Sequence, residues 1–329
     1  MNTPMNWLEK RWYSSKTSIL LLPLEGLFRL LVILRRLAFR LGLIPSYSVA
    51  VPVIVVGNIS VGGTGKTPLV VWLVKLLQKA GYHPGIVSRG YGGKAERWPQ
   101  QVRPDSDPMM VGDEPVMLAQ RCACPIIAAP DRVAAAKALL SHAKCDLIIT
   151  DDGLQHYRLK RDIEIVVIDA ERRFGNGHCL PAGPLREPQS RLEEVDFVVA
   201  NGLAGRGEFA MSLEQTGLKS LENDSFSKPI EELLGQRVHA LAGIGNPQRF
   251  FQLLRSRGLE VIEHAFPDHH DYQAQDLDFA DELPILMTEK DAVKCRRFAN
   301  HKMWYVPVNA HLPEPLALRL LQMLKKLTD

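Results

Sequence analysis

The sequence predicts an α/β protein with a mostly parallel sheet in a larger unit, followed by a smaller α/β unit. Three observations favour this class. Short apolar runs alternate with helical stretches over roughly 150 residues, which is typical of a doubly wound sheet. One of these runs leads into a glycine-rich turn and then a helix. The chain has 329 residues and is 46% hydrophobic, which is enough to bury the cores of two units.

The N-terminal unit, expected at 1–45, contains an amphipathic helical stretch from Ser18 to Pro45. Four arginines interrupt its leucines, so it has no window of about 20 uncharged residues that could span a membrane. At about 100° per residue, Glu25 and three of the arginines fall on one side. Two placements fit this pattern. The helix either lies in a membrane interface with its arginines toward anionic head groups, or packs on the protein's own core with its arginines in water.

The remaining elements are expected in two groups. The larger unit, 46–215, should contain apolar strands within 51–57, 85–88, 124–130, 144–153, 163–170 and 195–202, with helices from Lys66 and over Asp131–His142. Residues 203–229 lose this pattern and mark a boundary. The smaller unit, 230–329, should contain runs at 237–245, 259–266, 283–294 and 302–308, with helices near 248–257 and from Pro315.

The turn before Lys66 predicts a phosphate-binding loop. Gly65, Lys66 and Thr67 match the second half of G-x-x-x-x-G-K-[ST], whereas Ser60 stands where the first glycine is expected. Backbone N–H groups of such a turn surround phosphates, Lys66 would reach the β- and γ-phosphates, and Thr67 would bind Mg²⁺. The alternative is a glycine-rich turn with a chance match. The expected nucleotide-binding residues are Ser60, Val61, Gly62, Gly63, Thr64, Gly65, Lys66 and Thr67.

Acidic side chains follow the apolar run LIIT. Asp151 and Asp152 come at its end, where a carboxylate would face the ligand crevice of a parallel sheet. In a P-loop fold an acid at this place helps to hold Mg²⁺, and two adjacent acids repel each other unless a cation lies near. A turn cap is the alternative. Gln155 and His156 lie just beyond, within reach of the same crevice.

Three further segments are candidates for the site. Asp113 in VGDEP is, by position alone, more typical of a helix N-cap than of a catalyst. The cluster FPDHHDY could supply a histidine base oriented by an acid, but its adjacent histidines point apart and would make a poor metal site. The glycine-rich loops RGYGG and LPAGPLREP carry Arg89, Arg186 and Glu187, and either close over phosphates or serve as connections.

Composition limits the other classes of function. The net charge of +3 gives no support for a nucleic-acid partner. Five cysteines form an odd set without a C-x-x-C pair, which argues against a disulfide scaffold or structural zinc and fits a reducing, cytosolic setting.

Six motifs occur here in the order found in the tetraacyldisaccharide 4'-kinases, the lipid A 4'-kinases: GNISVGGTGKTP, SRGYGG, GDEP, DDGLQH, LPAGPLREP and FPDHH. The chain resembles this family over nearly its whole length. The resemblance implies a P-loop core with a smaller α/β domain, ATP and Mg²⁺ as cofactors, and phosphate transfer to the 4'-hydroxyl of an acylated glucosamine disaccharide 1-phosphate. It also implies a peripheral or monotopic place on the cytoplasmic face of the bacterial inner membrane. A lipid substrate favours the interfacial placement of the N-terminal helix.

The resemblance also implies roles for individual residues. Lys66 and Thr67 match the P-loop pair, and Asp152, with Asp151 beside it, resembles the Walker-B-type acid. Glu187 resembles a further Mg²⁺-site acid.

The catalytic pair implied by the resemblance is Asp113 and His269. His269 directly follows Asp268 in the D-H pattern, and His270 is the alternative. For this pair to act, the second unit must approach the P-loop.

Two rival functions remain open at this level. One is a P-loop GTPase of the metal-chaperone kind, for which TEKD at 288–291 is a near miss of [NT]-K-x-D with the lysine one place late. The other is a membrane-associated ATP switch without lipid kinase activity, which would not need the acids and the histidine cluster.

Overall fold

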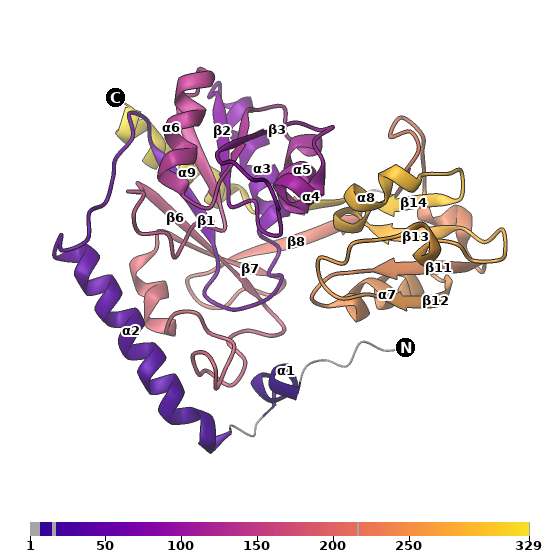
Figure 1. Ribbon diagram of the computed structural model, residues 1–329, viewed down its shortest axis with the longest axis horizontal. Helices are drawn as coiled ribbons and strands as arrows, with labels where there is room; N and C mark the ends of the chain where they lie inside the picture. The colour runs from indigo at the N-terminus through magenta and orange to yellow at the C-terminus, as the bar shows by residue number, and fades with distance from the viewer. Residues whose placement is uncertain (1–6, 15–17, 216, 329) are drawn as a thin grey trace.

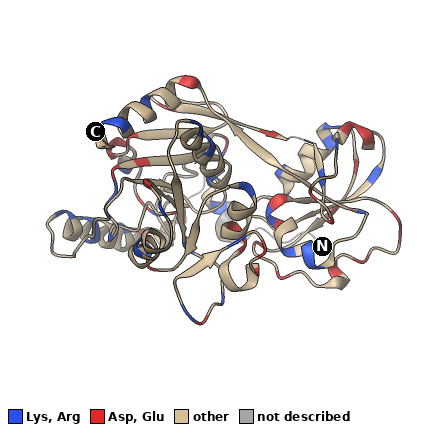
Figure 2. Ribbon diagram, turned by 90° about the horizontal axis from the view of Figure 1, so that it is seen from above, with Lys and Arg blue, Asp and Glu red and all other residues tan. Residues whose placement is uncertain are grey.

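The computed structural model describes residues 7–14, 18–215 and 217–328, and its two sheets lie side by side in a larger and a smaller unit (Figure 1). Lys and Arg are interspersed with Asp and Glu over both units (Figure 2). The predicted α/β class with mostly parallel sheets is confirmed. The expected N-terminal unit, 1–45, includes residues 1–6 and 15–17, and the expected smaller unit, 230–329, includes residue 329. These residues, and residue 216 between the expected units, lie outside the described residues.

The larger sheet has nine strands in the order β15-β8-β7-β6-β1-β5-β2-β4-β3, and it is parallel except for the edge strands β3 and β15. Its strands are β1 (Val53–Gly57), β2 (Pro84–Ser88), β3 (Gln100–Val102), β4 (Ile126–Ala128), β5 (Leu147–Asp151), β6 (Ile163–Asp169), β7 (Phe197–Asn201), β8 (Phe209–Gln215) and β15 (Val308–His311). The associated helices are α3 (Lys66–Lys79), α4 (Pro108–Val111), α5 (Asp113–Arg121), α6 (Arg132–His142), α9 (Glu314–Thr328) and the 3-10 helix η2 (Gln189–Glu194).

Both faces of this sheet are covered. Ile54 and Val56 of β1 lie in one apolar core with α3, α5 and α9, and Val53 and Val55 lie in a second core with α6. Burial on both faces explains why β1 reads as a continuous apolar run. Val56 is paired with Asp151 of β5, so the carboxyl ends of these two strands meet at one edge of the sheet.

The smaller unit contains a six-stranded sheet in the order β10-β9-β14-β13-β11-β12. Its strands are β9 (Leu218–Ser220), β10 (Ser227–Lys228), β11 (Arg237–Ala242), β12 (Glu260–Ala265), β13 (Ile285–Thr288) and β14 (Met303–Val306). Its helices are α7 (Pro247–Ser256), α8 (Glu289–Cys295) and the 3-10 helices η3 (Ile230–Leu233), η4 (Ala274–Asp276) and η5 (Arg296–Phe298). Apolar cores lie on both faces of this sheet as well.

The chain returns to the larger unit at its C-terminal end. β15 pairs with β8, and the α9 residues Leu316, Leu320 and Leu324 are fully buried in the core that also holds α3. The expected smaller unit, 230–329, therefore differs from the structure, because 308–328 pack on the larger sheet. The smaller sheet, 218–306, is inserted between β8 and β15.

The N-terminal segment forms α1 (Trp7–Trp12), the 3-10 helix η1 (Ile19–Leu21) and the long helix α2 (Leu22–Arg40), which runs along one side of the larger unit (Figure 1). Its charged side faces the protein. Arg36 pairs with Glu194, Arg40 Nη2 lies 2.8 Å from the same carboxylate, and Glu25 accepts a hydrogen bond from the backbone of Cys179.

The opposite side of α2 is apolar and exposed. Its exposed apolar residues, with those that flank the helix, are Ile19, Leu20, Leu24, Leu27, Leu30, Leu31, Ile33, Leu34, Leu37, Leu41, Leu43 and Ile44. Neither predicted placement describes this helix fully, because the ion pair with Glu194 turns Arg36 toward the protein, whereas Arg40 reaches the same carboxylate with a side chain that stays 63% exposed. Within the part of the chain that the structure describes, we find no helix that combines the length and the hydropathy of a membrane span.

Candidate functional site

The glycine-rich loop joins β1 to α3 and is held by two asparagines. Asn201 Nδ2 donates to the carbonyl of Thr64 at 3.2 Å, and Asn58 Nδ2 donates to the carbonyl of Gly62 at 3.3 Å. Gly65 has φ +96, and a Cβ there would lie 2.8 Å from Asn201. Glycine is thus required at this position both by the left-handed backbone and by the lack of space for a Cβ. The first backbone N–H groups of α3 remain at the open end of the loop.

The LPAGPLREP loop lies directly beside the phosphate loop. The Val61 N–H donates to the Pro184 carbonyl at 2.8 Å, and the Arg186 N–H donates to the Ile59 carbonyl at 2.7 Å. These backbone bonds carry the Arg186 side chain to the carboxyl end of β5. No local pattern indicated that 180–187 would pair with this particular loop.

Lys66 and Asp152 come together at the end of β5. Lys66 Nζ lies 3.4 Å from Asp152 Oδ1, and Arg186 Nη1 lies 3.4 Å from Oδ2. Burial alone would raise the pKa of Asp152, but the two cations outweigh burial and hold it below its ordinary value. Asp152 also has φ +50, a left-handed conformation that is uncommon outside glycine and recurs at functional sites.

Asp151 is the more buried of the two acids. It ends β5 and is 2% exposed, and its Oδ1 has no hydrogen-bond partner among the described residues. Burial, together with the nearby Glu114 carboxylate, raises the pKa of Asp151 to about 7. A buried carboxylate oxygen without a donor fits a cation, because Mg²⁺ binds to oxygen ligands from carboxylates and hydroxyls. Thr67, the second residue of α3, is at the adjoining loop.

Glu187 is held differently. It is 1% exposed and accepts hydrogen bonds from Gln155 Nε2 at 3.0 Å and from the Tyr157 hydroxyl. Gln155 Nε2 also donates to the Asn58 carbonyl, so this carboxylate is connected to the phosphate loop. Two donors fix its orientation, which suits a carboxylate that binds a metal through a remaining lone pair.

Asp113 and His269 bring the two units into contact. Asp113 begins α5 in the larger unit, and its carboxylate lies 3.1 Å from His269 Nδ1 in the loop after β12. The hydrogen bond to Asp113 raises the pKa of His269. Burial would raise the pKa of Asp113, but His269 and two lysines of α8 lower it below its ordinary value. His269 has φ +60, again in the left-handed region.

Two other predicted site residues, His270 and Arg89, lie near the Asp113–His269 pair and contact other side chains. His270 Nε2 lies 3.0 Å from Asp276, whereas His269 Nδ1 lies 3.1 Å from Asp113, so the geometry supports His269 as the paired histidine. Arg89 lies over the ring of Tyr91, which in turn lies 4.9 Å from the His269 ring.

His156 does not join the acids at the end of β5. Its Nε2 has no hydrogen-bond partner within the described part of the chain and lies 3.8 Å from Asp131. Burial and the nearby Arg132 lower the pKa of His156 to about 4, which leaves the ring neutral at physiological pH.

Several site residues were missed in the sequence. Arg132 is 3% exposed and donates to the Asp152 carbonyl at 3.3 Å, and Lys290 and Lys294 of α8 reach the Asp113–His269 pair. The available signal was the pair of lysines four apart in TEKDAVK, since positions i and i+4 share one face of a helix.

The TEKD segment has a structural role. Asp291 is fully buried and accepts hydrogen bonds from the Gly243 N–H, the Tyr272 hydroxyl and the Thr288 hydroxyl. Its oxygens are therefore engaged within the smaller unit, and the rival interpretation as a guanine-recognition motif is not favoured.

The sequence and the fold both match known proteins. The LpxK family model, described as tetraacyldisaccharide-1-P 4'-kinase, matches residues 17–325. A tetraacyldisaccharide 4'-kinase of Nitrosococcus oceani is 53% identical over 316 residues, covering 96% of this chain and 93% of the relative. One of Methylobacillus flagellatus is 52% identical over 326 residues, covering 98% and 97%.

A solved structure is similar as well. The crystal structure of LpxK from Aquifex aeolicus in complex with ATP has a TM-score of 0.78 and 30% sequence identity, covering 92% of this chain and 98% of that chain. The predicted P-loop kinase fold is thereby confirmed. The family match spans most of the sequence, and the chain belongs to the tetraacyldisaccharide-1-P 4'-kinase family.

Proposed function

We propose that the protein transfers the γ-phosphate of ATP to the 4'-hydroxyl of a tetraacylated glucosamine disaccharide 1-phosphate. The arrangement of the site is the main observation that supports this proposal. The phosphate loop with its acids lies in the larger unit, and the Asp113–His269 pair joins that unit to the smaller one at 3.1 Å. A nucleotide site and an acid–base pair are the two parts that a kinase acting on a hydroxyl needs.

The nucleotide side would work mainly by electrostatics. The amides of Gly62–Lys66 would surround the terminal phosphates, and the Lys66 ammonium would offset charge on the transferred group. Thr67, Asp152 and Glu187 would help to hold Mg²⁺ together with oxygens of the nucleotide, because the described residues contain no group of three or more acidic, histidine or cysteine side chains placed to hold a metal ion. The ion neutralises phosphate charge when bound. Such positioning supplies most of the rate in phosphoryl transfer.

The acceptor side would use His269 as a general base. The 4'-oxygen attacks the γ-phosphorus, the bond from that phosphorus to the bridging oxygen breaks, and ADP leaves with the electron pair. His269 Nε2 takes the hydroxyl proton, while Asp113 stabilises the imidazolium that forms.

The membrane surface is the second partner that we propose. The exposed apolar face of α2 would lie among lipid chains, on the cytoplasmic face of the inner membrane, so that a lipid substrate reaches the site without leaving the bilayer. The ion pairs with Glu194 would hold this face outward from the protein.

A direct assay tests the proposal. The purified protein is incubated with ATP labelled at the γ-phosphate, Mg²⁺ and the disaccharide 1-phosphate in mixed micelles, and we expect a labelled, doubly phosphorylated lipid. Asp113→Ala should lose most turnover, whereas Asp105→Ala, at an exposed acid earlier in the chain, should not. Nucleotide-dependent vesicle binding without labelled lipid would instead favour the switch, and preference for GTP would favour the GTPase.

A further inference from the structure

Lys290 of α8 lies next to Nε2 of His269, the ring nitrogen that Asp113 does not contact. Its Nζ is 3.4 Å from His269 Nε2, 3.1 Å from Asp268 Oδ1 and 3.2 Å from Glu114 Oε1. The side chain is 15% exposed, so its ammonium is held among these three groups rather than in bulk water. Lys290 therefore contacts both the imidazole of His269, which belongs to the smaller unit, and Glu114, which belongs to the larger unit.

The two contacts of the imidazole determine where its proton lies. A lysine ammonium carries only donors, so the neutral imidazole must accept at Nε2. The hydrogen then lies on Nδ1, where the Asp113 carboxylate accepts it at 3.1 Å. Both neighbours favour the same tautomer, and the lone pair is left on Nε2.

We propose that Lys290 is a positioning residue that keeps the lone pair of His269 on Nε2 and limits the basicity of the ring. The inference rests on the proposed function, in which Nε2 receives the proton of the acceptor hydroxyl. When that hydroxyl arrives it replaces the ammonium at Nε2, and Lys290 keeps Asp268 and Glu114 as ion-pair partners.

The charges around His269 oppose one another. Asp113 pairs with it from α5, Asp268 precedes it in its own loop, and Lys290 contacts it from α8. Behind these groups, Glu114 of α5 pairs with Lys290, Lys294 of α8 pairs with Asp113, and Arg89 lies over the Tyr91 ring.

These charges act on the imidazole in opposite directions. The hydrogen bond to Asp113 raises the pKa of His269, and the Lys290 ammonium lowers it. Burial also lowers the pKa of His269, so without Lys290 only burial would oppose the effect of Asp113. More of the imidazole would then be protonated and unable to accept a proton near neutral pH.

Lys290→Met tests the inference, because it removes the ammonium and keeps the length of the side chain. We expect the titration of His269, followed by NMR of protein labelled with ¹⁵N-histidine, to move up by about one pH unit. The acidic limb of kcat/KM should move up by a similar amount, since that limb reports groups of the free enzyme. Lys290→Arg retains the charge and should leave both close to wild type.

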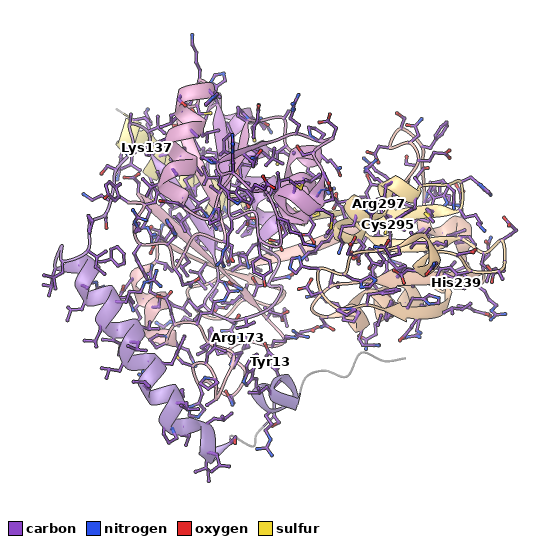
Figure 3. The ribbon with its side chains drawn as sticks, in the orientation of Figure 1. Tyr13, Lys137, Arg173, His239, Cys295 and Arg297 are labelled. Atoms are coloured by element: carbon purple, nitrogen blue, oxygen red, sulfur yellow. The ribbon has the colours of Figure 1, made fainter. Side chains whose placement is uncertain are left out.

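Two controls accompany these variants. Lys302→Met removes an ammonium paired with Glu282 at 3.4 Å in the smaller unit and should move neither reading. His239, paired with Asp281 at 3.1 Å, lies in the smaller unit on the side away from the larger one (Figure 3), so its imidazole signals provide an internal reference in the Lys290 variants.

An unchanged His269 titration in Lys290→Met would overturn the inference, as would a neutral ring with its hydrogen on Nε2. Because NMR reads the imidazole without turnover, this failure is distinct from failure of the proposed function, in which the wild-type protein makes no labelled lipid. Lost activity with an unchanged titration would likewise count against it, since a purely structural role predicts that result.

Discussion

Arg121 of α5 and Glu289 of α8 form an ion pair between the two units. Arg121 Nη1 lies 2.6 Å from Glu289 Oε1 and 2.7 Å from Oε2, and Arg121 Nη2 contacts Asn309 of β15. The side chains are only 16% and 14% exposed. Since Asp113 begins α5 and Lys290 follows Glu289 in α8, this pair fixes the two helices on which the proposed acceptor site depends.

Arg121→Met should therefore weaken the join between the units. Leaving the mostly buried Glu289 carboxylate without its partner is expected to lower the free energy of unfolding by about 2 kcal/mol, as measured by urea denaturation. Arg257→Met is the control, because its ion pair with Glu231 is 43% and 62% exposed and should contribute less than about 1 kcal/mol. Equal losses in the two variants would contradict this account.

Lys66→Met should remove nucleotide-dependent activity while leaving the fold intact. The ammonium is next to Asp152 at the mouth of the loop, and its loss is expected to lower kcat by a factor of about 100 or more. Initial rates with labelled ATP and titration with a fluorescent nucleotide measure the effect. Lys79→Met, at the exposed far end of α3, should keep wild-type values. A variant at Lys66 that binds and turns over normally would remove the phosphate loop from the mechanism.

The Asp113–His269 pair should make stability depend on pH with a definite sign. The pKa of His269 is raised from its ordinary 6.5, so its contribution is complete below that pH and is lost as pH rises through the raised value. The pKa of Asp113 is lowered from 3.8, so its contribution is present above that pH and lost as pH falls. The pair therefore stabilises most between these ordinary values.

His269→Gln should accordingly cost more unfolding free energy at pH 6 than at pH 9 when both are measured by urea denaturation. His301→Gln is the matched control, because His301 is 79% exposed and its change should cost little at either pH. A larger cost for His269→Gln at pH 9 would show that the sign is wrong.

The exposed face of α2 should govern binding to lipid vesicles. Changing Leu27, Leu30 and Leu34 together to serine removes apolar side chains that are 51–56% exposed and should weaken binding at least about tenfold in a flotation assay. The matched control changes Leu203, Leu234 and Leu318, which are equally or more exposed elsewhere. If both triple variants lose binding equally, the effect belongs to general surface hydrophobicity.

Local patterns accounted for much of the larger unit. The continuous apolar run of β1 and the glycines after it predicted a strand, a turn and a helix, and these occur at Val53–Gly57 and from Lys66. Placing Asp152 beside Lys66 followed from the rule that carboxyl ends of parallel strands share one edge of the sheet.

The pairing of strands that lie far apart in the chain could not be predicted from the sequence. β15 pairs with β8 across an inserted sheet, and no local periodicity connects strands so far apart in the chain. The helix α2 illustrates a second limit. Periodicity separated its charged and apolar sides, but Glu194, far along the chain, decides that the charged side faces inward.

The late return of the chain has a consequence for biosynthesis. On the ribosome, 218–306 emerge before β15 and α9, so the inserted sheet can fold while the nucleotide-binding core still lacks its last helix. Until Leu316, Leu320 and Leu324 have packed into place, the apolar surface that they cover beside α3 is accessible to chaperones and proteases. A chain that ends at Val306 should therefore be cleaved by protease within the larger unit and resist cleavage within the inserted sheet.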